Sequence, residues 1–434
     1  VEWTKWAEDI RLRWGNAMDY YRRELYFDIE FQQYLQYQFY RQWNQLKTYA
    51  NQRGIQLIGD IPIYVSMDSA DAWAHPELFQ LDSENVPLAV AGCPPDGFSA
   101  DGQLWGNPLY RWEYHRETGY QWWISRLAHC FRLYDVVRID HFRGFDEYYS
   151  IPYGETSAIH GHWEKGPGID LFRKVEQALG WKQVIAEDLG YVTDSVRRLV
   201  QESGFPGMKV LEFAFDSREG SDYLPHNYPT HCVVYTGTHD NDTILGWMNT
   251  APKASVKFAK EYLNLTKEEG YNWGMMRGAW ASVGDLAIVP MQDIIGVGSE
   301  GRMNTPSTLG GNWEWRATAD QIDNKLAKRL YKYLLDGRTD RDIAASLVND
   351  MFETVNELLP IDVLGVAVYS EDNHSLNYAF SPVEDENEEM REMMARSFDA
   401  KTSYWREKDR LKCLPLWVEA GNENRCTGVL ALKI

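Results

Sequence analysis

Asp135-Val136-Val137-Arg138-Ile139-Asp140-His141-Phe142-Arg143 is the stretch that decides the expected fold. Its apolar residues are β-branched, which indicates a short buried strand, and charged groups gather at the C-terminal end of that strand. Arg138 and Asp140 are two residues apart, so both side chains would point to the same face. In an α/β barrel, the C-terminal ends of the strands carry the chemistry.

The pair of Arg138 and Asp140 suits a covalent mechanism. An arginine beside a carboxylate favours its ionised form, and an ionised, positioned carboxylate is the nucleophile of a retaining glycosidase-type reaction. A structural ion pair at a strand end is the alternative, and this stretch alone leaves it open.

Six strand-then-helix units follow one another, which predicts a parallel α/β sheet. A closed (β/α)8 TIM barrel needs eight strands and about 250 residues. We therefore expect a TIM barrel that lacks its first two strands in this chain, with the missing pair upstream of Val1. The six expected strands lie at residues 55–63, 136–140, 184–187, 209–215, 232–238 and 285–290.

The chain divides into two expected regions. Residues 1–335 would form the barrel, incomplete at its N-terminus, and within them residues 68–112 read as a long functional loop with little regular pattern. Residues 336–434 would form a small, incomplete α+β region with two antiparallel strand pairs, weakly similar to a GAF-type sensor module. Its expected helices lie at 341–359 and 384–398.

Three of the expected strand ends carry carboxylates, at Asp140, Glu187 and Asp240. In a barrel they would converge on one mouth. Glycoside chemistry with retention needs one nucleophilic carboxylate and one acid/base carboxyl roughly 5 Å apart. Their proximity would push one pKa upward, which suits the acid/base. Structural roles are expected for the neighbouring polar residues. Asp188 would be a helix N-terminal or hydrogen-bonding residue, His141 would be structural, and His160 and His162 would be solvated or packed in a loop.

The chain resembles the amylomaltase family, the 4-α-glucanotransferases of the α-amylase clan, over roughly Val1 to Leu335. The motifs that carry the resemblance are Gly59-Asp60-Ile61-Pro62-Ile63, Trp105-Gly106-Asn107-Pro108-Leu109-Tyr110, Arg138-Ile139-Asp140-His141-Phe142-Arg143-Gly144, Ala186-Glu187-Asp188-Leu189-Gly190, Tyr235-Thr236-Gly237-Thr238-His239-Asp240-Asn241-Asp242 and Arg302-Met303-Asn304.

The resemblance implies a role for each matched residue. Asp140 would be the nucleophile, Glu187 the acid/base and Asp240 the stabiliser of the transition state. Arg138 and His239 would support the sugar at the cleavage point. Substrate contacts are expected from Asp60, Trp105, Asn304 and Phe98, the last in a loop where the family often has Tyr before Phe.

Composition excludes several other classes of protein. A formal net charge of −20 over 434 residues argues against a nucleic-acid binder. No apolar run approaches the ~20 residues of a membrane span. Five irregularly spaced cysteines and the absence of a visible signal peptide favour a cytoplasmic protein. No spacing suggests a metal site, and the expected chemistry needs no cofactor. The oligomeric state is left open.

The leading hypothesis is an enzyme that transfers a segment of an α-1,4-glucan to the 4-hydroxyl of glucose or a maltooligosaccharide, by a retaining double displacement. The first alternative is a hydrolase of the same clan, with water as the acceptor. The second is a non-catalytic glucan-binding or sensor protein. A chain with two open barrel edges is not expected to fold stably or turn over substrate alone.

Overall fold

The computed structural model describes residues 2–95, 100–190, 192–215, 221–306, 308, 310–336, 363–370, 375–381, 388–401, 403–406, 411–420 and 423–433. Contacts divide the chain into two compact units, Val1–Trp315 and Arg316–Ile434. The first unit contains every described residue for which a site role is expected.

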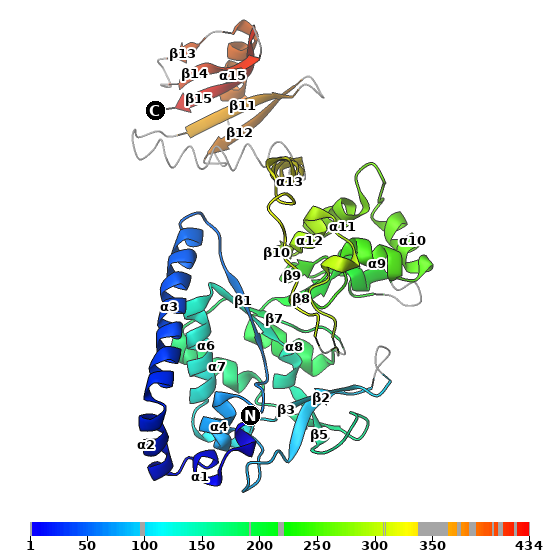
Figure 1. The fold of residues 1–434 in the computed structure, drawn as a ribbon. Helices are drawn as coiled ribbons and strands as arrows, with labels where there is room; N and C mark the ends of the chain where they lie inside the picture. Colours follow the sequence, from blue (N-terminus) through cyan, green and yellow to red (C-terminus); the bar gives the residue numbers. More distant parts are fainter. Residues whose placement is uncertain are drawn as a thin grey trace. The chain divides into compact units, whose positions relative to one another are not determined.

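Six parallel strands form the centre of the first unit (Figure 1). They are paired into two three-stranded sheets, in the orders β1-β4-β7 and β10-β9-β8. The amide of Ala186, in β7, donates to the carbonyl of Pro206, directly before β8, over 3.0 Å. This bond connects the two sheets. The strands are β1 (Ile58–Pro62), β4 (Val136–Asp140), β7 (Val184–Ala186), β8 (Gly207–Val210), β9 (Cys232–Tyr235) and β10 (Leu286–Ile288).

These strands confirm the six predicted units and their parallel direction. Several boundaries differ. The largest difference is at the strand expected at 209–215, which ends at Val210, because Leu211–Phe215 is a 3-10 helix. Leu211, Ala214 and Phe215 of this helix are buried, and a short apolar run of this kind does not distinguish a strand from a helical turn. The strand expected at 55–63 begins at Ile58, and the one expected at 232–238 ends at Tyr235. The described strands form two open sheets and do not close into a barrel.

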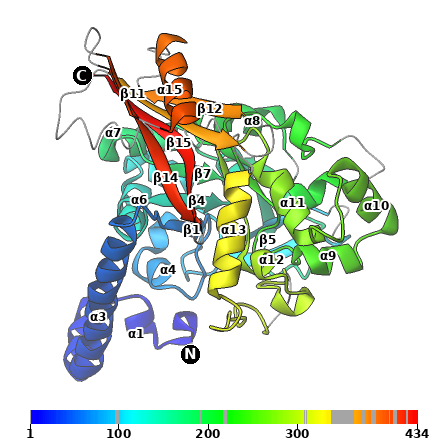
Figure 2. The same ribbon diagram turned by 90° about the horizontal axis from the view of Figure 1, so that it is seen from above.

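Helices cover the first sheet (Figures 1 and 2). Thr193 caps α8, because its hydroxyl accepts from the amide of Val196 over 3.3 Å. Gly204, with φ of 69°, ends the same helix in the left-handed conformation. The long helix α3 contacts α6 through Trp43, whose indole donates to the carbonyl of Leu133 over 2.8 Å. These helices are α3 (Tyr26–Asn51), α6 (Gln121–Leu133), α7 (Ile169–Leu179) and α8 (Asp194–Ser203).

A second group of helices lies beside β8, β9 and β10 (Figure 1). It comprises α9 (Ile244–Thr250), α10 (Lys253–Tyr262), α11 (Tyr271–Trp280) and α12 (Met291–Ile295). The remaining helices of the first unit that reach four residues are α1 (Glu8–Arg11), α2 (Gly15–Glu24), α4 (Ala70–Ala74) and α5 (Trp112–Glu117), together with the 3-10 helix Phe142–Phe145.

An antiparallel sheet in the order β3-β2-β5-β6 corrects the prediction of a long loop at 68–112. β2 (Ala89–Cys93) and β3 (Gln103–Pro108) lie inside that segment, and they pair across a register shift. β5 (Glu147–Pro152) and β6 (His162–Lys165) complete the sheet, so His162 starts a strand and is not in a loop. These strands are short and lack regular alternation of buried and exposed residues, which removes the usual sequence signal.

The second unit contains α13 (Asn324–Asp336) and a five-stranded antiparallel sheet in the order β12-β11-β15-β14-β13. Both predicted strand pairs are confirmed, as β11 with β12 and β14 with β15. Helix α15 (Glu388–Ala400) contacts β14 and β15. The helix expected at 341–359 lies outside the described residues. The strands are β11 (Val363–Ser370), β12 (Ser375–Ser381), β13 (Tyr404–Arg406), β14 (Leu411–Ala420) and β15 (Glu423–Lys433).

In the described part of the chain, none of the helices combines the length and the apolar character needed to cross a lipid bilayer.

Gly59 is predicted to be essential for the packing of β1. A Cβ at this position would overlap the ring of Tyr134, which also packs edge-on against Trp43. We expect Gly59→Ala to lower the free energy of unfolding by about 1–3 kcal/mol, since overpacking forces the neighbours to move. Gly15→Ala, in α2, is the control, because its Cβ would meet nothing within 4 Å. Urea unfolding of both variants measures the difference, and equal stabilities would contradict the packing argument.

Candidate active site

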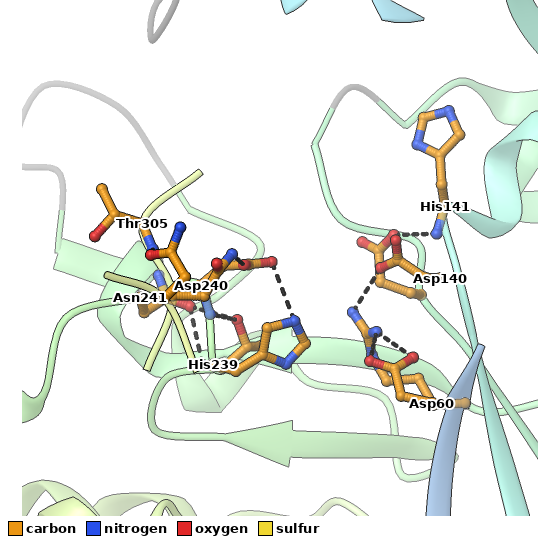
Figure 3. A network of polar contacts seen from close by, with 12 residues as sticks. Asp60, Asp140, His141, His239, Asp240, Asn241 and Thr305 are labelled. Carbon is orange, nitrogen blue, oxygen red and sulfur yellow. Dashed lines mark hydrogen bonds and ion pairs between the residues drawn. The ribbon is translucent and has the colours of Figure 1, made fainter. Parts of the chain in front are cut away.

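A buried arginine organises the C-terminal ends of β1 and β4. Asp60 lies directly opposite Arg138 in the register of these parallel strands. Arg138 Nη1 donates to both carboxylate oxygens of Asp60 over 2.7 Å, and Nη2 lies 3.0 Å from Asp140 Oδ1. Figure 3 shows Asp60 and Asp140 in this network. One guanidinium therefore holds two carboxylates from adjacent strands.

The charge of Arg138 is retained despite its burial. Only 7% of the residue is exposed, and burial works to lower the pKa of the guanidinium. Asp60 and Asp140 outweigh this effect and raise the pKa above its ordinary value. Arg138 therefore remains a fixed positive charge beside Asp140.

Several opposing effects act on the pKa of Asp140. Its side chain is 43% exposed, yet partial burial raises the pKa of this carboxyl, Arg138 lowers it, and Asp60 and Asp240 raise it again. The net pKa lies above the ordinary value for aspartate. Arg138 thus acts in the direction predicted from the sequence, but desolvation by the surrounding protein is the larger effect.

Glu187 follows β7, the neighbour of β4. Ile139 is paired with Ala186, so Asp140 and Glu187 come next on the two strands. The two oxygens of Glu187 accept from the amides of His141 over 2.7 Å and Leu189 over 2.8 Å. These bonds fix the orientation of the carboxyl group beside Asp140.

The environment of Glu187 makes it a titrating group near neutral pH. The residue is 8% exposed. Burial is the largest cause that raises the pKa of Glu187 to about 7, and the charge of Asp140 is the next. Arg138 and the two backbone amides oppose the rise. The expected upward shift is therefore present, with burial as its main cause and the neighbouring carboxylate second.

Asp240 forms a second polar group in the loop that follows β9. Its Oδ2 lies 3.4 Å from His239 Nε2, and its Oδ1 accepts from Asn304 Nδ2 over 2.6 Å. Burial works to raise the pKa of Asp240, but these two contacts outweigh it and lower the pKa below its ordinary value. The contact with Asp240 raises the pKa of His239.

The two groups interact electrostatically although they come from different sheets. Figure 3 shows Asp60, Asp140 and His141 in one group and His239, Asp240 and Asn241 in the other. Asp240 contributes to the raised pKa of Asp140, and Arg138 helps to lower the pKa of Asp240. The structure therefore brings the three carboxylates expected from the sequence to the same end of the parallel strands.

Trp105 reaches this region from β3 of the antiparallel sheet. Its ring is edge-on to His141, with centroids 4.8 Å apart, and 36% of the residue is exposed. An exposed tryptophan beside His141, the residue that follows Asp140, suits the apolar face of a sugar ring. Phe98, the other expected aromatic contact, lies outside the described residues.

Several residues have roles at the site that sequence reasoning missed. His141 adopts a left-handed conformation with φ of 53°, which is rare for a residue other than glycine and marks a constrained backbone. Its amide donates to Glu187, so its structural role is to orient that carboxyl group. Arg302 Nη2 donates to the carbonyl of Asp240 over 2.6 Å, and the Trp313 ring lies 4.9 Å from that of His239.

A weak signal for these residues was available. Arg302 belongs to the Arg302-Met303-Asn304 motif, and Trp313 lies in a loop rich in glycine and asparagine. No sequence pattern identifies the conformation of His141. Asp188 has the hydrogen-bonding role predicted for it, because its Oδ1 accepts from the amide of Met208 over 2.7 Å and connects β7 to β8.

Across the described ranges, no three His, Cys, Asp or Glu side chains are grouped in a way that could hold a metal ion. The chemistry that the site offers is that of carboxyl groups: an arginine-paired carboxylate next to a buried carboxyl that exchanges a proton near neutral pH.

Known proteins resemble this chain closely over its first three quarters. A family model described as 4-alpha-glucanotransferase matches residues 1–321. A 4-alpha-glucanotransferase of Clostridium butyricum is 48% identical over 334 residues, which cover 76% of this chain and 69% of that protein. One from Streptococcus pneumoniae is 48% identical over 324 residues, covering 74% of this chain and 64% of that protein. The chain thus spans about two thirds of the length of these curated relatives.

A solved structure is also similar. The amylomaltase from Streptococcus agalactiae in complex with acarbose shares 41% sequence identity and a TM-score of 0.75, with 78% of this chain and 68% of that chain covered. Its likeness supports the α/β arrangement described above.

The raised pKa of Glu187 predicts a specific response to substitution of its neighbour. Asp140→Asn removes the second largest cause of the shift, so the pKa of Glu187 should fall from about 7 toward the ordinary value for glutamate while burial keeps it above that value. Carboxyl titration by infrared or ¹³C NMR spectroscopy measures this change. Asp240→Asn is the control and should move the pKa less, because Asp240 is not among the leading causes. An unchanged pKa in Asp140→Asn would show that the two carboxyls are not coupled.

Proposed function

The chain belongs to the 4-alpha-glucanotransferase family, and from that premise we propose that it carries the catalytic site of an enzyme that transfers a segment of an α-1,4-glucan to a new 4-hydroxyl acceptor. The observation that carries the proposal is the pair of unlike carboxyls, Asp140 bound to Arg138 and Glu187 with a pKa of about 7. A retaining mechanism needs an ionised carboxylate as the nucleophile beside a protonated carboxyl group as the acid.

The roles are assigned by environment. Asp140 attacks the anomeric carbon, the bond to the leaving oxygen breaks, and Glu187 gives its proton to that oxygen. The 4-hydroxyl of an acceptor then attacks the same carbon, Glu187 takes its proton, and the ester to Asp140 breaks. Asp240, whose pKa is lowered by His239 and Asn304 against the effect of burial, supplies negative charge to the oxocarbenium-like transition state.

Substrate contacts are proposed for the residues around these carboxyls. Arg138 and His239 support the sugar at the cleavage point, Asp60 and Asn304 offer hydrogen bonds, and Trp105 offers an aromatic face. Phe98 is proposed for a further aromatic contact. The substrates are α-1,4-glucans and maltooligosaccharides, since a related amylomaltase has been solved in complex with acarbose.

We further propose that the six parallel strands are part of a (β/α)8 barrel, which requires two strands in addition to the six described. Residues 336–434 are proposed as a separate α+β module of GAF type, on the strength of the antiparallel sheet and α15. A cytoplasmic location is proposed from the number and spacing of the cysteines.

Transfer and hydrolysis differ in the products formed from maltotriose. The complete enzyme is expected to convert maltotriose into glucose and longer maltooligosaccharides, because the maltosyl–enzyme ester that remains when glucose leaves would be intercepted by an acceptor sugar. Chromatography of the products over time provides the measurement, and Asp140→Asn protein is the control for background activity. Glucose and maltose as the sole products would mean that water is the acceptor and that the protein is a hydrolase. Glucan binding without any turnover would instead support the non-catalytic alternative.

The roles of Asp140 and Glu187 can be separated by trapping the ester. In Glu187→Gln protein, a substrate with a poor leaving group cannot be protonated, whereas a glucosyl fluoride needs little protonation and should still form the ester. Release of the ester would be slow, since Glu187 must also activate the acceptor. We expect the ester to accumulate on the peptide that contains Asp140, detected by mass spectrometry.

Asp140→Asn is the matched variant for the trapping experiment. It keeps the shape of the side chain but removes the attacking charge, so we expect a loss of several orders of magnitude in rate with every leaving group and no ester. A label on Asp240, or equal losses in the two variants with all substrates, would overturn the assignment.

A further inference from the structure

Asp293 is a buried carboxylate of α12 that the proposed reaction does not use. The residue is 2% exposed, and burial is the main cause that raises its pKa to about 6. Its oxygens nevertheless have well-defined partners: Oδ2 accepts from the hydroxyl of Thr236 over 3.0 Å, and Oδ1 accepts from the amide of Ile244 over 2.8 Å. A buried carboxylate that retains two donors is expected to fix the position of both.

These two donors are the boundaries of the loop that carries Asp240. Thr236 is fully buried and directly follows β9, and Ile244 is the first residue of α9. The segment between them is Gly237–Thr243. A single side chain, Asp293, therefore holds both ends of this loop.

The position of Asp293 is itself well determined. Asn272 of α11 donates from Nδ2 to the carbonyl of Asp293 over 2.7 Å. Asn272 is 7% exposed, so this bond lies in the protein interior. Helix α11 thereby anchors α12, and α12 in turn presents Asp293 to the loop.

Hydrogen bonds and close contacts in and beside the loop Gly237–Thr243 also restrict its conformation. Asn241 Oδ1 accepts from both the amide and the hydroxyl of Thr238 over 2.9 Å. At the β9 end, the amide of Glu212 donates to the carbonyl of Thr236 over 3.1 Å, and a Cβ added to Gly237 would lie 3.2 Å from Glu212 Oε1. The loop therefore has little room to shift toward β8.

We propose that Asp293 is a positioning residue for Asp240: by binding Thr236 and Ile244 it fixes both ends of the loop Gly237–Thr243 and so sets where the Asp240 carboxylate lies. The inference rests on the proposed role of Asp240 in stabilising the transition state. Asp293 acts through the backbone of the loop and does not contact the sugar. Because electrostatic stabilisation depends on preorganised geometry, a small displacement of the loop is costly to the rate.

The hydrogen bond between Thr236 and Asp293 can be removed with little change in the shape of the side chain. Thr236→Val keeps the volume of the side chain but leaves Asp293 Oδ2 without its hydroxyl donor, whereas Thr236→Ser keeps that donor. We expect Thr236→Val to lower kcat on maltotriose between about ten- and a hundredfold, with a much smaller change in KM. Thr236→Ser should restore most of the rate, and its recovery identifies the hydrogen bond as the cause.

Thr250→Val is the control for loss of a hydroxyl group in the same region. The Thr250 hydroxyl donates to the carbonyl of Gly246 over 3.0 Å, within α9 and away from the loop. We expect this variant to keep the wild-type kcat. Near-UV circular dichroism and thermal unfolding of all variants show whether the fold is retained. An equal loss of rate in Thr250→Val and Thr236→Val, or a loss that Thr236→Ser does not restore, would overturn the positioning role.

Asp240→Asn, assayed in parallel in the complete enzyme, separates this inference from the function on which it rests. An inactive Asp240→Asn together with a fully active Thr236→Val would refute the role of Asp293 and leave the proposed mechanism intact. A fully active Asp240→Asn would refute the proposed role of Asp240 itself. An inactive Asp240→Asn with the pattern of losses described for Thr236 supports both.

Discussion

The buried guanidinium of Arg138 is the interaction on which the site depends. It lies at the ends of parallel strands and binds Asp60 and Asp140, which would otherwise repel each other. A buried ion pair contributes little net stability, but loss of one partner leaves an uncompensated charge and is strongly destabilising. The arrangement is therefore better understood as a means of holding carboxylates in defined positions than as a source of stability.

The other carboxyls are held by the backbone around them. Glu187 is fixed by the amides of His141 and Leu189, and the backbone of His141 is left-handed. Asp240 is fixed by His239 and Asn304, and the ends of its loop are bound to Asp293. Each candidate catalytic carboxyl thus has its orientation set before any substrate arrives, as electrostatic catalysis requires.

The strands and helices near the site could be predicted where a few neighbouring residues in the sequence mark them. β4 is a continuous run of buried residues, and Thr193 begins α8 with a standard capping residue. The antiparallel sheet that carries Trp105 was missed because β2 and β3 are short and pair with a register shift, and because β2 also pairs with β5, some fifty residues away. Such pairings are stabilised by residues that are distant in the chain, and a local sequence pattern does not reveal those residues.

The sequence by itself determined the six parallel strands, the polar residues at their ends and the family to which the chain belongs, because short apolar runs and specific motifs are local properties of the chain. Only the tertiary structure decided how those residues act on one another. Burial rather than charge is the main reason that the pKa of Glu187 is raised, and Asp293, which no motif singled out as catalytic, binds both ends of the Asp240 loop. Desolvation and long-range hydrogen bonds depend on which surfaces meet in three dimensions, and the linear order of residues does not specify this directly.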